Sequence, residues 1–483
     1  MARIKFGTDG WRAVIAEDYT FENLERVTHA TVRWLKKTYG DSPSVVLGHD
    51  TRFQGRAFAE RSACVFASHG VKVIFAQTFT STPAIAWSTK EHGCDAGIVI
   101  TASHNPPEYN GFKIKANFGG PASPEQIAAV ESELGTIGVG RSEDGASEGG
   151  FTPRSFSDLR AEGLIEMRDI TQAYLDMLRE RLGIDAIRAS GLRLAHDAMY
   201  GAGQRMVVRL LGAEAVLPLH HDFNPGFHGQ APEPIERNLG ELAEAVVQED
   251  CDAGLANDGD ADRIGMFDER GVFVDSHQLL ALLVKYLHEE RGLSGDIVKT
   301  FSTTHMLNKM GEKYGLKVHT VPIGFKYIGS KIVEGDVLVG GEESGGMAVK
   351  GHIPERDGIY IGLLVVEMMV KRGKKPSELV QELFDEFGPH VARRDDVHTT
   401  NEKKQAILDR LSKGGLEEIA GRPVQEVDTL DGYKHLLKDG WLLVRPSGTE
   451  PVLRIYSEAP TEEAARAMID DAVEQLGVGE VPA

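Results

Sequence analysis

The fold class follows from residues 96–106, Ala96-Gly97-Ile98-Val99-Ile100-Thr101-Ala102-Ser103-His104-Asn105-Pro106. The first five residues are an apolar run typical of a buried strand, and the polar residues after them form a loop that ends at Pro106-Pro107. An α/β fold places its reacting groups there, just past the carboxyl end of a strand. Ser103 is a candidate nucleophile, because a serine hydroxyl needs a neighbouring base such as His104 or a charged setting. The same residue types also form ordinary turns, so this loop alone does not identify a functional site.

The loop Asp258-Gly259-Asp260-Ala261-Asp262-Arg263 also follows an apolar run, Ala253-Gly254-Leu255-Ala256. In an extended segment, side chains at alternate positions point the same way, so the three carboxylates converge on one point. Unpaired carboxylates repel one another, and a hard divalent cation such as Mg²⁺ or Ca²⁺ resolves that repulsion. The spacing therefore indicates a metal site, with a solvated acidic turn as the alternative.

A calcium EF-hand is a competing interpretation of this loop, since Glu269 falls at loop position twelve. The EF-hand needs glycine at position six for its sharp turn, and Arg263 stands there. No helical pattern leads into the loop either, so the sequence disfavours an EF-hand.

Two glycine-containing loops follow strand-like segments farther along the chain. Gly340-Gly341-Glu342-Glu343-Ser344-Gly345-Gly346 offers acceptors suited to sugar hydroxyls, although a glycine-rich surface turn looks similar. Arg445-Pro446-Ser447-Gly448-Thr449-Glu450-Pro451 offers a guanidinium, hydroxyls and backbone N–H groups suited to phosphate. Its alternative is a hairpin turn with a surface arginine.

A regular spacing links the four loops. Each loop is preceded by an acidic residue and a short apolar strand-like run, and a polar loop residue lies eight positions after the acidic residue. The pairs are Asp95 and Ser103, Asp252 and Asp260, Asp336 and Ser344, and Asp439 and Ser447. The first three suggest duplicated α/β domains that offer equivalent strand ends to a shared cleft, whereas the fourth has different flanks.

Length and charge restrict the class of protein. A chain of 483 residues is too long for one core and suggests three or four domains. The formal net charge of −20 argues against nucleic-acid and anionic-membrane partners. The three cysteines lie in apolar contexts and are expected to be reduced, and the first residues lack the apolar core of a signal peptide, so a cytoplasmic location is expected.

The order of patterns predicts α/β domains followed by a different last domain. Strand-like runs at 45–48 and 71–75 flank a helical pattern at 56–68, which favours βαβ units. Strands near 390–400 and 441–456, with helices near 401–413 and 461–476, predict an α+β region. We expect a phosphoserine-loop domain at 1–150, a linking α/β domain at 151–255, a metal-loop and sugar-loop domain at 256–375 and a phosphate-binding domain at 376–483.

Five motifs in this order resemble those of the α-D-phosphohexomutases, and the resemblance runs from end to end. They are Phe6-Gly7-Thr8-Asp9-Gly10-Trp11-Arg12, the serine loop with Tyr109-Asn110-Gly111-Phe112-Lys113, the triple-Asp loop, the Glu-Glu-Ser loop and the Arg-Pro-Ser-Gly-Thr-Glu-Pro loop. The resemblance implies an α/β fold of three similar domains with mixed sheets plus a C-terminal α+β domain, around one central cleft. It implies an isomerase of carbohydrate metabolism that moves phosphate between C1 and C6 of a hexose.

The resemblance also implies roles for individual residues. Ser103 carries a phosphoryl group and, with Asp258, Asp260 and Asp262, binds one Mg²⁺ per active site. Ser103, His104, Lys113 and Arg12 act in catalysis, and either Lys113 or His104 moves the hydroxyl proton. A hexose 1,6-bisphosphate is the intermediate and activator. The substrate-binding residues that it implies are Arg263, Lys299, Gly324, Lys326, Glu342, Ser344, Arg445, Ser447, Gly448 and Thr449.

The preferred sugar is predicted from two segments. Gly341-Glu342-Glu343-Ser344-Gly345 looks more like phosphoglucomutases than phosphomannomutases, where the middle acid is commonly Met. Val321-Pro322-Ile323-Gly324-Phe325-Lys326 resembles the glucose branch except at Ile323, where Thr is usual. Phosphoglucosamine mutases usually have Ile-Arg after the opening motif and Glu-Gln-Ser in the sugar loop. We therefore rank glucose first, dual glucose and mannose second, and glucosamine third.

Two other functional classes stay open at this point. In a metal-dependent sugar phosphatase, water would take the phosphoryl group from Ser103, but such an enzyme needs no clamp for a second phosphate. A non-catalytic sugar-phosphate sensor would need neither Ser103 nor the three aspartates. The partners expected are small hexose phosphates, with no nucleic acid and no membrane, for a monomer or a homodimer.

Overall fold

The computed structural model describes residues 4–7, 9–135, 154–447 and 451–478. The chain divides into two compact units. Unit 1 comprises residues 1–276, 329–335 and 344–377, and unit 2 comprises residues 277–328, 336–343 and 378–483. Within the described residues, no helix combines the length and the apolar character that crossing a membrane requires. The domain boundary expected between residues 150 and 151 falls outside the described residues.

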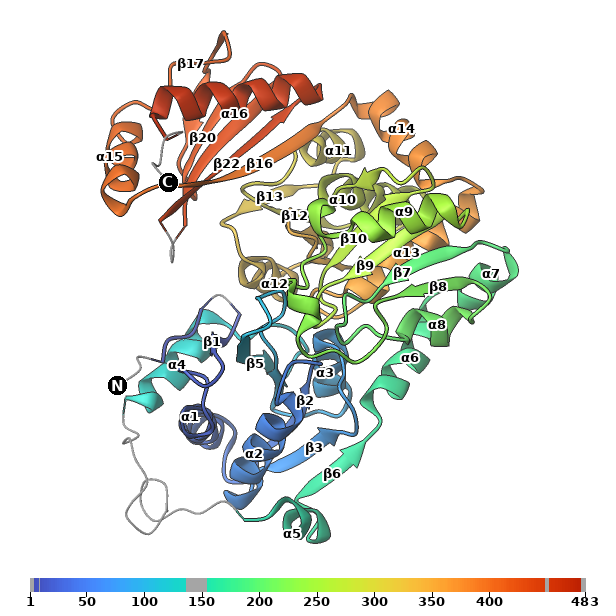
Figure 1. Cartoon of the computed structure of the whole chain (residues 1–483), viewed down its shortest axis with the longest axis vertical. Coiled ribbons are helices and arrows are strands. Elements are labelled where there is room, and N and C mark those ends of the chain that lie inside the picture. Colours follow the sequence, from blue (N-terminus) through green and yellow to red (C-terminus); the bar gives the residue numbers. More distant parts are fainter. Residues whose placement is uncertain (1–3, 8, 136–153, 448–450, 479–483) are drawn as a thin grey trace. The chain divides into compact units, whose positions relative to one another are not determined.

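The first sheet of unit 1 has the strand order β1-β5-β4-β2-β3-β6 (Figure 1). The strands β2, β3, β4 and β6 are parallel, and β1 and β5 are antiparallel to their neighbours. Its strands are β1 (Trp11–Val14), β2 (Ser44–His49), β3 (Lys72–Ala76), β4 (Ala96–Ile100), β5 (Tyr109–Ala116) and β6 (Ile165–Arg168). Its helices are α1 (Phe21–Tyr39), α2 (Gly55–Ser68), α3 (Thr82–Glu91), α4 (Pro124–Leu134) and α5 (Phe156–Ala161). This sheet confirms the strand predicted at 96–100.

The helix α3 packs closely on the centre of this sheet because two strand residues lack a side chain. A Cβ at Gly48 would lie 2.7 Å from Ile85 Cδ1, and one at Gly97 would lie 2.3 Å from Thr89 Oγ1. Ser81 caps the helix by accepting from the Ala84 N–H. This packing fixes the N-terminal end of α3, and thus Thr82, near the carboxyl end of β4.

The second sheet of unit 1 has the order β11-β10-β9-β7-β8. Its strands are β7 (Leu194–Asp197), β8 (Val216–Leu219), β9 (Ala253–Asn257), β10 (Ile264–Asp268) and β11 (Phe273–Val274). Its surroundings include α6 (Ile170–Arg181), α7 (Ile184–Ala189), α8 (Met206–Leu211), α9 (Gly240–Gln248), α13 (Gly358–Arg372) and 3₁₀ turns at Phe227–Gly229 and Glu236–Asn238. The helices α9 and α13 both pack against β9 and β10.

The domain boundary expected between residues 255 and 256 differs from the structure. It falls inside β9, which pairs along its length with β7 and with β10. A boundary there would break two ladders of backbone hydrogen bonds. The loop of three aspartates therefore belongs to the sheet that begins with β7, not to the segment that follows.

The two sheets of unit 1 share one arrangement around the predicted repeat. β4 lies between parallel β2 and antiparallel β5, and β9 lies between parallel β7 and antiparallel β10. The acidic residue before each strand also acts alike. Asp95 accepts from the Ser44 N–H at 2.8 Å, and Asp252 accepts from the Arg193 N–H at 2.9 Å. Each carboxylate thus binds the backbone at the start of the adjacent parallel strand.

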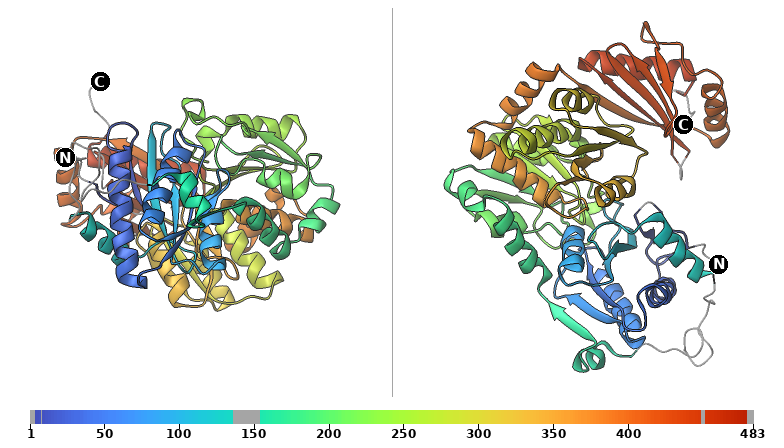
Figure 2. Two further views of the ribbon diagram at one scale, coloured as in Figure 1. Left: turned by 90° about the horizontal axis from the view of Figure 1, so that it is seen from below. Right: turned by 180° about the vertical axis from the view of Figure 1, so that it is seen from behind.

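Unit 2 contains a parallel group in which β12 lies between β13 and β14. Its C-terminal part is an antiparallel sheet of order β16-β22-β21-β20-β19, with α16 along one face (Figure 2). The strands are β12 (Asp296–Thr300), β13 (Val318–Val321), β14 (Val337–Gly341), β16 (Val391–His398), β19 (Glu426–Asp428), β20 (Tyr433–Leu437), β21 (Gly440–Pro446) and β22 (Val452–Ala459), with β17 (Glu418–Ile419) and β18 (Arg422–Pro423) as a hairpin. The helices are α11 (Met306–Tyr314), α15 (Asn401–Leu411) and α16 (Glu462–Leu476). The predicted α+β region is confirmed.

A few elements lie at or near the places where the chain changes unit. These are α10 (Ser276–Lys285), which continues into a π-helical turn at Tyr286–Glu290, α12 (Phe325–Glu334), β15 (Met347–Val349) and α14 (Pro376–Phe387). The strand β14 ends at the sugar loop, as the sequence predicts.

Candidate active site

Ser103 lies in the loop between β4 and β5, and its side chain is buried. Its φ of 54° is in the left-handed region, which serine rarely adopts. Its backbone N–H donates to Thr101 Oγ1 at 2.8 Å. Its Oγ donates to Asp258 Oδ2 at 2.8 Å. The two loops that the sequence pointed to, 155 residues apart, thus meet at one hydrogen bond.

The three aspartates of the loop between β9 and β10 form one buried cluster. Asp258, Asp260 and Asp262 have no exposed surface, and one oxygen from each lies within 4.8 Å of the others. Asp258 Oδ1 accepts from the N–H groups of Asp262 at 2.9 Å and Arg263 at 3.1 Å, which holds the turn. The loop joins two strands rather than two helices, so it is not an EF-hand.

The residues of this cluster fit a divalent cation. Oδ1 of Asp260 and Oδ1 of Asp262 are buried and have no hydrogen-bond partner among the described residues. Burial, followed by the charges of Asp262 and Asp260, raises the pKa of Asp258 well above its usual value. Buried, unpaired carboxylate oxygens at this spacing are the ligands that Mg²⁺ prefers. The cluster and Ser103 Oγ could hold such an ion together.

Lys113 forms ion pairs with the carboxylate cluster. Its ammonium is 2.8 Å from Asp260 Oδ2, 3.3 Å from Asp262 Oδ2 and 2.8 Å from Asp9 Oδ2. Burial disfavours this charge, but the three carboxylates outweigh it and raise the pKa of Lys113. The side chain is therefore a fixed positive charge beside the serine loop.

His104 and Arg12 complete the surroundings of Ser103. His104 Nδ1 lies 3.4 Å from Ser103 Oγ. Burial and the nearby Arg263 and Arg12 lower the pKa of His104 well below its usual value, so its ring is neutral. Arg12 donates to Asn105 Oδ1 at 2.6 Å, which ties β1 to the serine loop. Of the two candidates for proton transfer, His104 is the neutral group nearest Ser103, and Lys113 is the charged one.

Three residues that sequence reasoning did not assign also enter the site. Thr82, at the start of α3, donates through Oγ1 to Asp260 Oδ2 at 2.5 Å. Arg356 lies 2.6 Å from Asp262 Oδ2 and 2.7 Å from Asp9 Oδ2. Burial would raise the pKa of Asp9, yet Lys113 and other nearby cations hold it well below its usual value. Asp9 could have been predicted as a site residue, because it belongs to the opening motif of residues 6–12. No motif near Arg356 in the sequence indicates a role for that residue.

Arg263 and Ser344 are also brought near the cluster. Arg263 pairs with Gly346 in an antiparallel bridge, and the Ile264 N–H donates to the Gly345 carbonyl at 3.1 Å. The segment that begins at Ser344 therefore runs beside the end of the aspartate loop. The Arg263 guanidinium lies 3.3 Å from Glu233 Oε1.

The other predicted substrate-binding residues lie in unit 2, and Gly448 and Thr449 lie outside the described residues. Glu342 and Lys299 are buried. Lys299 donates to the Thr304 carbonyl at 2.7 Å, and burial lowers its pKa to about 8. Its contacts in this structure are thus backbone carbonyls. Gly324 and Lys326 lie at the start of α12, where Gly324 has a φ of 133°.

Arg445 and Ser447 lie at the end of β21. Arg445 Nε donates to Asp431 Oδ1 at 3.0 Å, and Asp431 Oδ2 accepts from the Ile323 N–H at 2.8 Å. Asp431 therefore orients the guanidinium and holds the segment that precedes Gly324. Ser447 is buried, and its N–H donates to the Val452 carbonyl.

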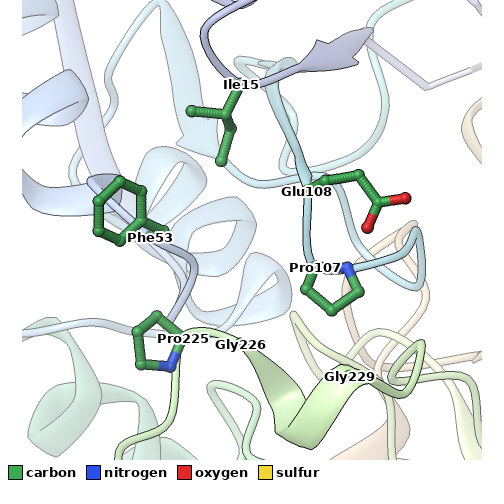
Figure 3. Close-up of a pocket in the computed structure, with 7 residues that line it drawn as sticks. All are labelled: Ile15, Phe53, Pro107, Glu108, Pro225, Gly226 and Gly229. Atoms are coloured by element: carbon green, nitrogen blue, oxygen red, sulfur yellow. The ribbon is translucent and has the colours of Figure 1, made fainter.

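A pocket of 480 Å³ opens beside the serine loop, and Figure 3 shows the side chains around it. Its lining is Ile15, Phe53, Pro107, Glu108, Pro225, Gly226 and Gly229. Among these described residues there is a carboxylate but no cationic side chain, so the lining does not suit a sugar phosphate. The sugar-phosphate candidates lie elsewhere.

Four domain models of one family match the chain in order. They are the phosphoglucomutase/phosphomannomutase α/β/α domain I over residues 3–138, domain II over 172–271, domain III over 275–387 and the C-terminal domain over 396–475. The second matched segment contains the aspartate loop, in agreement with its place in the second sheet.

Curated relatives and a solved structure match over nearly their whole length. The chain is 34% identical over 475 residues to phosphoglucomutase/phosphomannomutase of Thermococcus kodakarensis, and the match covers 98% of each chain. It is 32% identical over 477 residues to phosphoglucosamine mutase of Carboxydothermus hydrogenoformans, covering 97% of this chain and 98% of the relative. A Thermus thermophilus structure provisionally described as a phosphomannomutase superposes with a TM-score of 0.84, at 35% identity and 99% coverage of both chains.

Proposed function

Because the chain belongs to the phosphoglucomutase/phosphomannomutase family and is a phosphohexomutase, we propose that glucose 1-phosphate and glucose 6-phosphate are its preferred substrates. We propose that phosphorylated Ser103 and glucose 1,6-bisphosphate are the intermediates. The observation that carries this proposal is the hydrogen bond of 2.8 Å from Ser103 Oγ to Asp258 Oδ2. It sets the acceptor hydroxyl against a cluster of carboxylates suited to Mg²⁺.

The reaction consists of two phosphoryl transfers that balance each other. In the first, the bond from phosphorus to Ser103 Oγ breaks as the free sugar hydroxyl attacks, and the hydroxyl proton passes to a nearby base. The resulting bisphosphate turns around, and its other phosphoryl group returns to Ser103. Lys113, Arg12 and Arg263 supply positive charge near the transferring group. Mg²⁺ bound by the aspartates would neutralise charge on the same group.

The preference for glucose rests on the sugar loop. Its middle acid, Glu343, accepts from Thr300 Oγ1 at 3.1 Å, so the end of β12 orients it. A methionine at this position, as in many phosphomannomutases, could not accept that bond. Relatives named for mannose and for glucosamine substrates keep those sugars as the second and third candidates.

A parallel assay tests the sugar and the reaction class together. With glucose 1-phosphate, mannose 1-phosphate and glucosamine 1-phosphate as substrates, we expect the highest kcat/KM for glucose 1-phosphate, with the 6-phosphate as product. A higher value for either of the other sugars would refute the glucose preference alone. Release of inorganic phosphate equal to substrate loss would instead identify a phosphatase.

Arg445→Ala tests the proposed clamp for the phosphate that does not react. The variant loses a bidentate, charge-assisted contact, so we expect KM to rise about 10- to 100-fold. The bisphosphate should also escape during its turn, and added glucose 1,6-bisphosphate should restore part of the activity. Turnover as a function of both ligands measures the two effects.

Arg393→Ala is the matched control for this variant. Arg393 lies on β16 of the same sheet and pairs with Glu462 at the surface, so its loss should change neither KM nor bisphosphate retention. Unchanged KM and retention in Arg445→Ala would mean that the end of β21 is not the clamp.

A further inference from the structure

The side chain of Arg52 is buried directly beneath the serine loop and has no exposed surface. Its Nη2 donates to the carbonyls of Ser103 at 2.6 Å and Asn105 at 2.5 Å. Its Nη1 donates to the carbonyls of Pro106 at 2.8 Å and Tyr109 at 3.0 Å. One guanidinium thus binds three backbone carbonyls of the loop between β4 and β5, and the carbonyl of Tyr109 at the start of β5.

Thr101, which is hydrogen-bonded to Asp50, binds the backbone N–H of Ser103. The Thr101 hydroxyl donates to Asp50 Oδ2 at 2.5 Å and accepts from the Ser103 N–H at 2.8 Å. Asp50 Oδ2 also lies 3.3 Å from Arg52 Nε, and Asp50 Oδ1 accepts from the Arg52 N–H at 2.9 Å. The three residues Asp50, Arg52 and Thr101, here called the serine clamp, therefore bind both the N–H and the carbonyl of Ser103.

The conformation of Ser103 explains why its backbone needs such support. A φ of 54° is disfavoured for serine and persists only where the surroundings fix it. The Ser103 carbonyl also faces the aspartate loop closely, since a Cβ at Gly259 would lie 2.4 Å from it. Any shift of this carbonyl would therefore move Ser103 relative to Asp258.

A turn that follows a strand of the second sheet also contacts Arg52. The guanidinium lies over the ring of Phe227, 5.0 Å from its centroid, in a cation–π contact. Phe227 belongs to the 3₁₀ turn between β8 and α9. Arg52 thus touches both the serine loop and the segment that leads to the aspartate loop.

We propose that Asp50, Arg52 and Thr101 are positioning residues for the phosphoryl transfer, which they serve by fixing the backbone of Ser103 so that Oγ meets Asp258 and the incoming hydroxyl. The inference rests on the proposed role of Ser103 as phosphoryl carrier. None of the three side chains contacts Ser103 Oγ among the interactions of the described residues, so they act through the backbone.

Thr101→Val is the sharpest test, because valine keeps the shape of threonine and removes only the hydroxyl that links Asp50 to the Ser103 N–H. We expect kcat to fall about 10- to 100-fold, the effect of a small misplacement of a reacting group. The KM for glucose 1-phosphate should stay within about two-fold, since Thr101 has no exposed surface that a substrate could contact. Thr101→Ser, which keeps the hydroxyl, should retain most of the wild-type kcat.

The rate should be measured per phosphorylated site, so that a loss of folded protein does not count as a loss of rate. Each variant is phosphorylated with glucose 1,6-bisphosphate, and its phosphoserine is quantified by intact mass. The phosphorylated protein is then mixed in excess with glucose 1-phosphate, and the first-order formation of glucose 6-phosphate in a single turnover is followed. A purely structural role would lower the thermal midpoint and leave this first-order rate unchanged. That result, or an equal loss in Thr101→Ser, would overturn the proposal.

Arg52→Lys provides a second test, because an ammonium cannot reproduce the fork that binds four carbonyls. We expect a rate loss per phosphorylated site at least as large as that of Thr101→Val. Arg56→Lys is its control, since Arg56 is exposed and binds the Gln77 carbonyl and Glu60 at the surface. A wild-type rate in soluble Arg52→Lys would contradict the serine clamp.

The behaviour of the wild-type protein distinguishes failure of the proposed function from failure of the serine-clamp proposal. If it acquires no phosphoserine at position 103, the proposed function fails and the clamp proposal falls with it. If the wild type transfers its phosphoryl group and Thr101→Val does so equally fast, only the clamp proposal fails.

Discussion

Replacing Ser103 with alanine should abolish turnover, a loss on the order of a thousand-fold or more, because the variant has no hydroxyl to carry the phosphoryl group. The backbone of residue 103 would keep its hydrogen bonds to Thr101 and Arg52, so the thermal midpoint should stay close to that of the wild type. Intact-mass measurement should find one extra phosphoryl group on a fraction of the wild-type molecules and none on the variant.

Ser132→Ala is the control for Ser103→Ala. Ser132 is exposed on α4 and donates to the Ala129 carbonyl, so its loss should alter neither activity nor phosphorylation. Full activity of Ser103→Ala would refute the phosphoserine mechanism, and a phosphoryl group retained by an inactive variant would place the modification on another residue.

Asp258→Asn should remove the response to Mg²⁺ and lower kcat by about a hundred-fold or more. Asparagine has nearly the shape of aspartate, and its Oδ1 can still accept from the N–H groups of Asp262 and Arg263. The measurement is the thermal midpoint with and without Mg²⁺. Saturation at a hundred times Kd should stabilise the wild type by about 2.7 kcal/mol and the variant by much less.

Without metal, the order of thermal stability should be reversed, with Asp258→Asn more stable than the wild type. Burial and the neighbouring Asp262 and Asp260 raise the pKa of Asp258 above its value in the unfolded chain. A carboxyl of this kind destabilises the fold once it ionises, so the wild type loses stability as the pH rises from the unfolded pKa of about 4. Without metal at neutral pH, Asp258→Asn should therefore unfold at a higher temperature than the wild type.

Asp250→Asn controls for the loss of one negative charge. Asp250 is exposed in the same domain and has a φ of 52°, a conformation that asparagine tolerates equally well. It should leave the Mg²⁺ response intact. An unchanged Mg²⁺ response in Asp258→Asn would show that Asp258 is not a ligand.

The serine loop and the aspartate loop were predictable because local sequence determines them. The apolar runs before Ser103 and Asp258 are buried strands, β4 and β9, and polar residues begin where each strand ends. Alternation along the aspartate loop also predicted convergence of its carboxylates. The domain boundary at 255/256 was wrong because an apolar run alone does not reveal which strands it pairs with.

Other site residues were not predictable, because their role depends on contacts between distant segments. Arg356 and Asp9 are 347 positions apart, and Arg356 lies just before α13, which packs against the second sheet. Arg52 gave no signal, because an arginine after a strand is usually at the surface. Its burial under four carbonyls follows from the path of the loop between β4 and β5, which no local pattern encodes.

The proposed nucleophile, Ser103, and the carboxylate cluster lie in loops of different sheets of unit 1, so they meet only where those two sheets have docked. A chain in which either sheet is unfolded carries an ordinary serine and a hydrated acidic turn, and neither can hold a transferable phosphoryl group. The proposed reactive centre therefore forms only when both sheets of unit 1 have folded. Newly made or damaged chains in which either sheet is unfolded would therefore be unreactive towards sugar phosphates.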